Sequence, residues 1–123
     1  MPELPDITVY VEALRRRIVG QPLEEVRLKT PFLLRTVEPP LADLIGKRVA
    51  GVERLGKRII LEMDDELFVV FHLMIAGRLH WKVRGAKGGG RSDLAAFEFP
   101  PGILSLTEAG TKRRASLHLV RGR

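Results

Sequence analysis

Residues 58–73 read RIILEMDDELFVVFHL, and the fold follows most directly from this stretch. Two runs rich in leucine, aromatic and β-branched side chains, 58–63 and 67–73, flank the acidic triplet 64–66. Runs of this length and composition are typical of strands, and a connection this short is typical of a hairpin. The stretch therefore predicts an antiparallel β-hairpin with a tight turn at 64–66.

Strand-like patterns continue on both sides of this hairpin. Apolar and polar side chains alternate in several short segments, and Pro100-Pro101-Gly102 separates two of them as a strong turn signal. Short strands at such regular spacing predict an antiparallel sandwich or barrel. The predicted strands besides the hairpin are 23–29, 48–55, 78–83, 94–99, 103–107 and 115–120.

Residues 6–19 have helical rather than strand periodicity. Their apolar stripe consists of Ile7, Val11, Leu14 and Ile18. Gly20 supplies a C-terminal stop, so the segment predicts an amphipathic helix. Residues 41–45 predict a further short helical turn, and the glycine-rich residues 85–93 predict a basic hairpin connection.

The 123-residue chain has the length of one domain, and 45% of its residues are hydrophobic, which is enough to form a core. It contains no cysteine, which excludes disulfides and thiolate zinc sites and is typical of a cytoplasmic protein. No apolar run approaches the ~18 residues of a membrane span. The spacing of His72, His80 and His118 matches no metal site, so we expect no metal and no small-molecule cofactor in this chain. His72 lies in an apolar run and is expected to be structural.

The formal net charge is +6, and the basic residues cluster in two segments. Residues 78–93 contain five Lys or Arg against one Asp, and residues 110–123 contain five with no acid. Clustered positive charge indicates a polyanionic partner such as nucleic acid. The alternative is a solvated basic surface that only aids solubility, and charge alone favours neither interpretation.

The N-terminus, Met1-Pro2-Glu3-Leu4-Pro5, contains a candidate nucleophile. An initiator methionine is normally removed before a small residue, which would leave Pro2 with a free secondary amine. Because an α-amino group titrates near ~8, an appreciable neutral fraction can attack an aldehyde-like sugar carbon and form an iminium. Glu3 could act beside it as general acid or base. The alternative is a terminus that the prolines merely stiffen, and a retained Met1 would make the Pro2 nitrogen an unreactive amide.

Four motifs occur in the order found in one enzyme family. They are PELP at 2–5, LGKR at 55–58, HLMIAGRL at 72–79 and TKRR at 111–114. Together they resemble the formamidopyrimidine-DNA glycosylase / endonuclease VIII family, and the resemblance covers essentially the whole chain. The implied fold is mainly β with flanking helices, namely a two-layer antiparallel β-sandwich with an N-terminal α-helix.

The resemblance implies a bifunctional DNA glycosylase/AP lyase of base excision repair, which removes oxidised bases through an N-terminal proline Schiff base. Pro2 would supply the attacking nitrogen at C1′ of the damaged nucleotide, and Glu3 would protonate the sugar ring oxygen. Lys57 would contact phosphate or the lesion from a strand or hairpin end. The implied DNA-binding residues are Met74, Ile75, Arg78, Lys112, Arg113 and Arg114.

The chain departs from the family at the residues that fill the space left by a flipped-out base. The family's methionine falls on Ile75, with Met74 where glycine is usual, and its phenylalanine falls on Ala115. An apolar wedge needs bulk rather than a particular group, so Ile75 or Met74 can serve, whereas Ala115 cannot stack on a base. The sequence therefore predicts a divergent member whose chemistry is intact and to which the family's lesion preference does not carry over.

Residues 1–123 correspond to the family's N-terminal catalytic domain. The resemblance implies that the C-terminal helical DNA-binding domain, which often carries a structural zinc, is absent from this chain. We expect a monomer that acts on damaged double-stranded DNA in the bacterial cytoplasm at the nucleoid, does not bind membranes, and is weak or inactive as an isolated domain. The alternatives are a module that binds damaged DNA without cleaving it and, last, a basic β-domain that binds RNA or another protein.

Overall fold

The computed structural model describes residues 4–29, 33–36, 40–74, 77–83, 93–108 and 115–122. Within these residues the chain forms an N-terminal helix, eight strands and short 3₁₀ turns. The helical elements are α1 (Leu4–Ile18), η2 (Leu41–Leu44) and η3 (Asp64–Glu66). The strands are β1 (Glu25–Leu28), β2 (Val49–Leu55), β3 (Arg58–Met63), β4 (Leu67–His72), β5 (Gly77–Lys82), β6 (Asp93–Phe99), β7 (Gly102–Glu108) and β8 (Ser116–Arg121).

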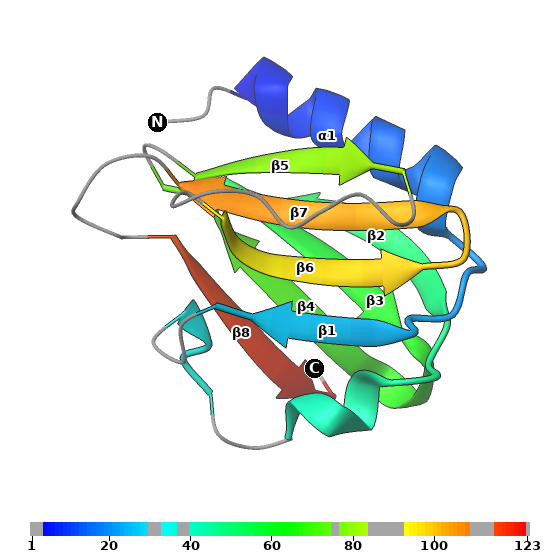
Figure 1. Ribbon diagram of the computed structural model, residues 1–123. Helices are drawn as coiled ribbons and strands as arrows, with labels where there is room; N and C mark the ends of the chain where they lie inside the picture. Colours follow the sequence, from blue (N-terminus) through cyan, green and yellow to red (C-terminus); the bar gives the residue numbers. More distant parts are fainter. Residues whose placement is uncertain are drawn as a thin grey trace.

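The strands form two antiparallel sheets that pack face to face (Figure 1). One sheet has the order β1-β6-β7-β5 and the other the order β2-β3-β4-β8. The buried rings of Phe71 on β4 and Phe97 on β6 meet edge to face between the sheets, with centroids 5.5 Å apart. The two-layer antiparallel β-sandwich predicted from the sequence is therefore confirmed.

The predicted hairpin forms the centre of the second sheet. β3 and β4 pair in register from Arg58↔His72 to Met63↔Leu67, and the turn between them, η3, has a φ of 64° at Asp65. Alternate side chains point into the core, and they are Ile59, Leu61, Met63, Leu67, Val69 and Phe71. The intervening side chains, Arg58 and His72 among them, lie on the outward face because successive residues of a strand point to opposite sides.

Helix α1 lies along the side of the sandwich formed by the edge strands β2 and β5 (Figure 1). The apolar stripe predicted for this helix is buried and consists of Ile7, Val11, Leu14 and Ile18. The Arg15 Nε atom donates a hydrogen bond to the Val52 carbonyl of β2 at 2.8 Å, which anchors the helix to this sheet. Gly20 has a φ of 86° and ends the helical path as predicted, and its N–H donates to the Val49 carbonyl at 2.8 Å.

Candidate functional site

A pocket of about 480 Å³ lies at one end of the β2-β3-β4-β8 sheet. The tip of the β2–β3 hairpin lines one part of it and the end of β4 the other. Strand register explains this neighbourhood, because Leu55 pairs with Arg58 across the hairpin and Arg58 pairs with His72 on β4. The lining residues are Leu55, Gly56, Lys57, Arg58, His72, Leu73 and Met74.

Lys57 lies at a hairpin tip, the position that the sequence predicts for it. Gly56 and Lys57 form the turn, and Gly56 has a φ of 62°, which glycine adopts without strain. The turn places the exposed Lys57 beside the pocket, while the strands behind it are held by the core. An ammonium group in this position is suited to bind a phosphate or to stabilise developing negative charge.

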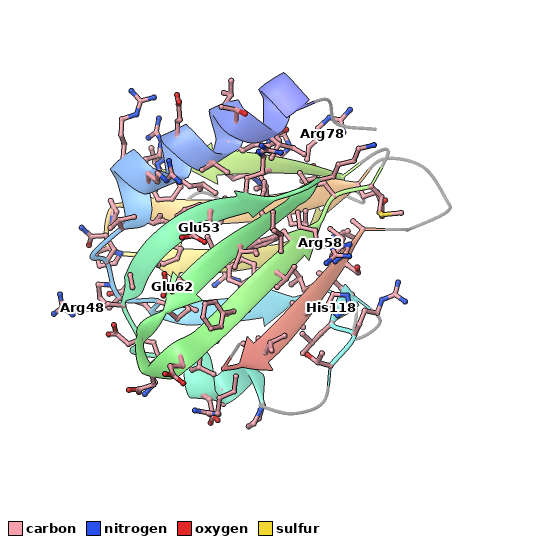
Figure 2. The ribbon with its side chains drawn as sticks, turned by 180° about the vertical axis from the view of Figure 1, so that it is seen from behind. Arg48, Glu53, Arg58, Glu62, Arg78 and His118 are labelled. Carbon is pink, nitrogen blue, oxygen red and sulfur yellow. The ribbon has the colours of Figure 1, made fainter. Side chains whose placement is uncertain are left out.

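His72 ends β4 and lines the same pocket. Its burial lowers the pKa of His72, and the neighbouring charges of Arg58 and His118 lower it further. The rings of His72 and His118 have centroids 5.0 Å apart. Arg58 and His118 belong to the outward face of the sheet, which is turned toward the viewer in Figure 2. Near neutral pH His72 is therefore a neutral imidazole, which can donate one hydrogen bond without adding positive charge.

The lowered pKa of His72 predicts how stability depends on pH. Well above about pH 6.5 the imidazole is neutral in both states, and as the pH falls the unfolded chain takes up the proton before the folded chain does. The free energy of unfolding therefore decreases with falling pH. Between about pH 7.5 and pH 5, we expect the free energy of unfolding to decrease less in His72→Gln than in the parent, as measured by urea unfolding. His80→Gln, at an exposed residue of β5, controls for loss of any histidine, and equal changes in both variants would refute the prediction.

Met74 lines the pocket with its backbone in the left-handed region. It has a φ of 58°, and 40% of its surface is exposed. This conformation costs a residue other than glycine about 1–2 kcal/mol, so the chain holds strain at a pocket residue. The turn closes where the Gly77 N–H donates to the Leu73 carbonyl at 2.9 Å. Of the two residues predicted as apolar wedges, Met74 lines the same pocket as Lys57, and Ile75 lies outside the described residues.

Gly77 begins β5 directly against the backbone of Leu73. A Cβ atom at this position would lie 2.3 Å from the Leu73 carbonyl oxygen, so the turn would have to shift. We expect Gly77→Ala to reduce the free energy of unfolding by about 1–3 kcal/mol, as measured by urea unfolding. Gly51→Ala is the matched control, since its Cβ would make an ordinary 3.5 Å contact with Glu62. Equal stability of the two variants would contradict this account of the turn.

Arg78, a predicted DNA-binding residue, is exposed on β5 (Figure 2). Its guanidinium Nη1 donates to the Gly77 carbonyl at 2.8 Å, and Arg78 is not among the residues that line the pocket. The structure thus brings Lys57 and Met74 together and leaves Arg78 outside their pocket. The other predicted site residues lie outside the described residues, and they are Pro2, Glu3, Ile75, Lys112, Arg113 and Arg114. The predicted connection at 85–93 also lies outside them, except for Asp93, which begins β6.

Some of the basic side chains contribute to the fold. Arg121, in the C-terminal basic segment, pairs with Asp43 of η2 at 3.0 Å. The guanidinium of Arg17 lies over the ring of the half-buried Trp81, 5.4 Å from its centroid. Part of the positive charge of the chain therefore takes part in structural contacts.

The chemistry of the pocket suits an anion. Lys57 and Arg58 supply positive charge, and His72 supplies a hydrogen-bond donor. Over the described part of the chain, no group of three or more His, Cys, Asp or Glu side chains is placed to hold a metal ion. Among the same residues, no helix has the length and apolarity that crossing a membrane requires.

Known proteins match this chain over nearly its whole length. A model of the family described as "Formamidopyrimidine-DNA glycosylase N-terminal domain" matches residues 1–116. The formamidopyrimidine-DNA glycosylase of Mycoplasma genitalium is 29% identical over 121 residues, which are 97% of this chain. That of Novosphingobium aromaticivorans is 34% identical over 122 residues, which are 98% of this chain. The chain spans less than half of these relatives, 42% and 43% of their lengths respectively.

Solved structures give the same result for the fold. Lactococcus lactis formamidopyrimidine-DNA glycosylase, non-covalently bound to DNA that contains an AP site, matches with a TM-score of 0.87 at 26% identity. That match covers 98% of this chain and 45% of the other. The complex of the Lactococcus lactis protein with FAPY-dG-containing DNA also has a TM-score of 0.87 at 26% identity, and covers 97% and 44%.

Proposed function

Since the chain belongs to the formamidopyrimidine-DNA glycosylase family, we propose that it is the catalytic domain of a DNA glycosylase of base excision repair. The proposed substrate is double-stranded DNA that contains an oxidised base. The names of the relatives and the DNA-bound structures support this assignment. The chain spans less than half of those relatives. We also propose that the protein acts as a monomer in the cytoplasm, at the nucleoid.

The observation that carries the proposal is the pocket around Lys57. Two cations and a neutral imidazole face one cavity, so a phosphodiester there gains charge neutralisation and a directional hydrogen bond. Apolar Leu73 and Met74 complete the lining. The pocket can therefore hold the backbone of one nucleotide while an apolar side chain approaches the stacked bases.

The proposed chemistry starts at the N-terminus, two residues before α1 begins at Leu4. After removal of Met1, the Pro2 amine attacks C1′ of the damaged nucleotide, and the bond from C1′ to the base breaks as the base leaves with a proton. Glu3 protonates the sugar ring oxygen, the ring opens, and an iminium joins the Pro2 nitrogen to C1′. Loss of a proton from C2′ then expels the 3′ phosphate and cuts the strand, while Lys57 balances phosphate charge.

This function is tested with the protein expressed as its gene encodes it. The substrate is a duplex with one formamidopyrimidine lesion, and the products are free base, measured by mass spectrometry, and cleaved strand. We expect both products at the same site. Binding without base release would favour the non-cleaving module, and tighter binding to RNA than to abasic DNA of equal length would favour the basic β-domain that binds RNA. Either result would contradict the glycosylase assignment.

Replacing Met74 by glycine should have opposite effects on the stability of the chain and on its binding to DNA. Met74→Gly relieves the left-handed backbone, so we expect the free energy of unfolding to stay unchanged or to rise by up to about 1 kcal/mol. Loss of the apolar side chain should weaken binding to a duplex with an abasic site about tenfold, an effect of about 1.4 kcal/mol. Met74→Leu keeps the bulk and should bind like the parent. Parental affinity in Met74→Gly would show that Met74 does not contact the DNA.

A further inference from the structure

The outward face of the β2-β3-β4-β8 sheet carries acidic side chains on one part and basic side chains on another. Glu53 and Glu62 come from β2 and β3, whereas Arg58 lines the pocket and His118 belongs to β8 (Figure 2). Strand pairing places Glu53 and His118 at the two ends of one row across the sheet, with two apolar residues between them. A polyanion that leaves the pocket along this face is therefore repelled from β2 and directed toward β8.

Arg35 extends the basic part of this face beyond β8. Its backbone N–H donates to the Leu117 carbonyl at 2.9 Å, and Leu34 and Leu117 form a parallel bridge. Residues 33–36 therefore run beside β8 like a further strand. Because bridged residues point to the same side of a sheet and successive residues alternate, the exposed Arg35 lies next to His118 on the outward face.

Four side chains thus form a basic strip, which consists of Arg58, His72, His118 and Arg35. The strip begins at the pocket, which Arg58 and His72 line, and the ring of His118 follows with its centroid 5.0 Å from that of His72. Within the described part of the chain, no ion pair engages Arg35 or Arg58, and no hydrogen bond engages either imidazole ring. The donors of the strip can therefore be used by an anionic ligand.

Building on the proposed function, we propose that Arg35 and His118 form a second phosphate site, which binds the DNA backbone next to the Lys57 pocket. Neighbouring strands lie about 5 Å apart, so Arg35 is about 10 Å from the strand that carries His72, and one DNA strand can occupy both sites. The guanidinium of Arg35 can bind a phosphate through two parallel hydrogen bonds, and the imidazole of His118 can donate one more. Neither residue belongs to the DNA-binding set that the sequence predicts.

The salt dependence of binding tests the charge of Arg35. Binding of the native gene product to a duplex with a tetrahydrofuran abasic analogue is measured by fluorescence anisotropy, from about 50 to about 300 mM KCl. Each phosphate contact contributes about 0.9 to the slope of log affinity against log salt concentration, so Arg35→Ala should lower the slope by about 0.9 and weaken binding about fivefold near 150 mM. Arg35→Lys keeps the charge and should keep the slope.

Arg48→Ala is the matched control for the loss of an exposed arginine. Arg48 lies on the far side of this face from Arg58 and His118 in Figure 2, and its Nη1 donates to the Gly20 carbonyl at 3.3 Å. We expect Arg48→Ala to keep the parental slope. An equal decrease in Arg48→Ala and Arg35→Ala would show that the net charge of the chain, and not a second phosphate site, sets the salt dependence, and would overturn the proposal.

The hydrogen bond from His118 is tested by replacing its ring. His118→Phe keeps a ring but has no N–H donor, so we expect binding to weaken about three- to tenfold. His118→Gln keeps a donor and should bind like the parent. His80→Phe is the control, because His80 lies on the other sheet with its Nε2 atom 2.8 Å from the Thr107 hydroxyl, and it should also bind like the parent. Parental affinity in His118→Phe would remove His118 from the site.

Neutral methylphosphonates, placed one at a time in the duplex, locate the phosphate. At one position the substitution should weaken binding of the parent about fivefold and leave binding of Arg35→Ala unchanged, because the contact is already lost. The variants should fold, since the Leu119 N–H still donates to Thr36 Oγ1, and circular dichroism checks this. Arg35→Gln replaces Arg35→Ala if the latter does not fold.

The results separate the second phosphate site from the proposed function. A folded Arg35→Ala or Arg35→Gln with the parental slope, and with the parental response to every methylphosphonate, would overturn the second site and leave the glycosylase assignment standing. Failure of the parent to bind abasic DNA would overturn the proposed function and the second site with it.

Discussion

The chain from which Met1 has been removed should form a borohydride-stable adduct with abasic DNA, and the same chain with Met1 retained should not. A free secondary amine can form an iminium with the opened sugar, whereas the nitrogen of a Met1–Pro2 peptide bond is an amide without a basic lone pair. We expect adduct yield to fall at least about 100-fold in the retained form, as the loss of a covalent nucleophile requires. The two forms are separated by mass and compared on one gel.

The two forms also provide their own control. They share every side chain except that of Met1, so their circular dichroism and their affinity for a tetrahydrofuran duplex, which cannot form the iminium, should agree closely. A difference confined to trapping assigns the nucleophile to the N-terminal nitrogen. Equal trapping by both forms would show that the Pro2 nitrogen is not the group that attacks the sugar.

Replacing Lys57 by alanine should lower the rate of base release about 100-fold or more. Lys57 is held at the tip of the β2–β3 hairpin and lines the pocket with Arg58 and His72. Removing one preorganised group that stabilises developing charge typically costs a factor of this size. The measurement is single-turnover base release from a formamidopyrimidine duplex, because it separates chemistry from product release.

Two variants give the Lys57 experiment its controls. Lys57→Arg keeps the charge and should recover part of the rate, with a deficit because the guanidinium has a different shape. Lys47→Ala removes a lysine that pairs with Asp65, at the opposite end of the β3–β4 hairpin from the pocket. It should change stability by no more than about 1 kcal/mol and leave the rate unchanged. An equal loss of rate in Lys47→Ala and Lys57→Ala would mean that overall charge, and not the pocket, matters.

The sequence could predict the sandwich because its signals are local. Acidic residues at 64–66 separate two apolar runs, and a helical stripe ends at Gly20, so β3, β4 and α1 can be read from short windows. The order of the strands within each sheet does not depend on local signals. β1 pairs with β6, and β5 with β7, across long stretches of chain. Alternation shows which face of a strand is buried, but it does not select the partner, so those pairings could not be predicted.

The position of His72 shows a further limit of the sequence. β4 is apolar on both faces, because Phe68 and Val70 are half-buried on the outward side. That run hides the period of two, so the sequence predicts a structural His72 and gives no sign that His72 lines a pocket. The two turns contain the missing information. The turn at Gly56 fixes the register that pairs Leu55 with Arg58. The turn at 64–66 fixes the register that pairs Arg58 with His72.

Ala115 has a different position from the one its alignment with a base-stacking phenylalanine suggests. It is buried, and its N–H donates a hydrogen bond to the Glu108 carboxylate. That Ala115 does not stack on a base stays a prediction. Residue type alone could not reveal the hydrogen bond, because it joins residues at the ends of strands in different sheets.

The most direct test of the proposed chemistry is the identity of the residue that becomes covalently linked to DNA. Borohydride reduction during reaction with a formamidopyrimidine duplex, followed by nuclease and protease digestion and tandem mass spectrometry, locates the modified atom. We predict that the sugar remnant is attached to the nitrogen of Pro2 in a chain that has lost Met1. Attachment to Lys57 or another lysine, or base release without any adduct, would contradict the proposal.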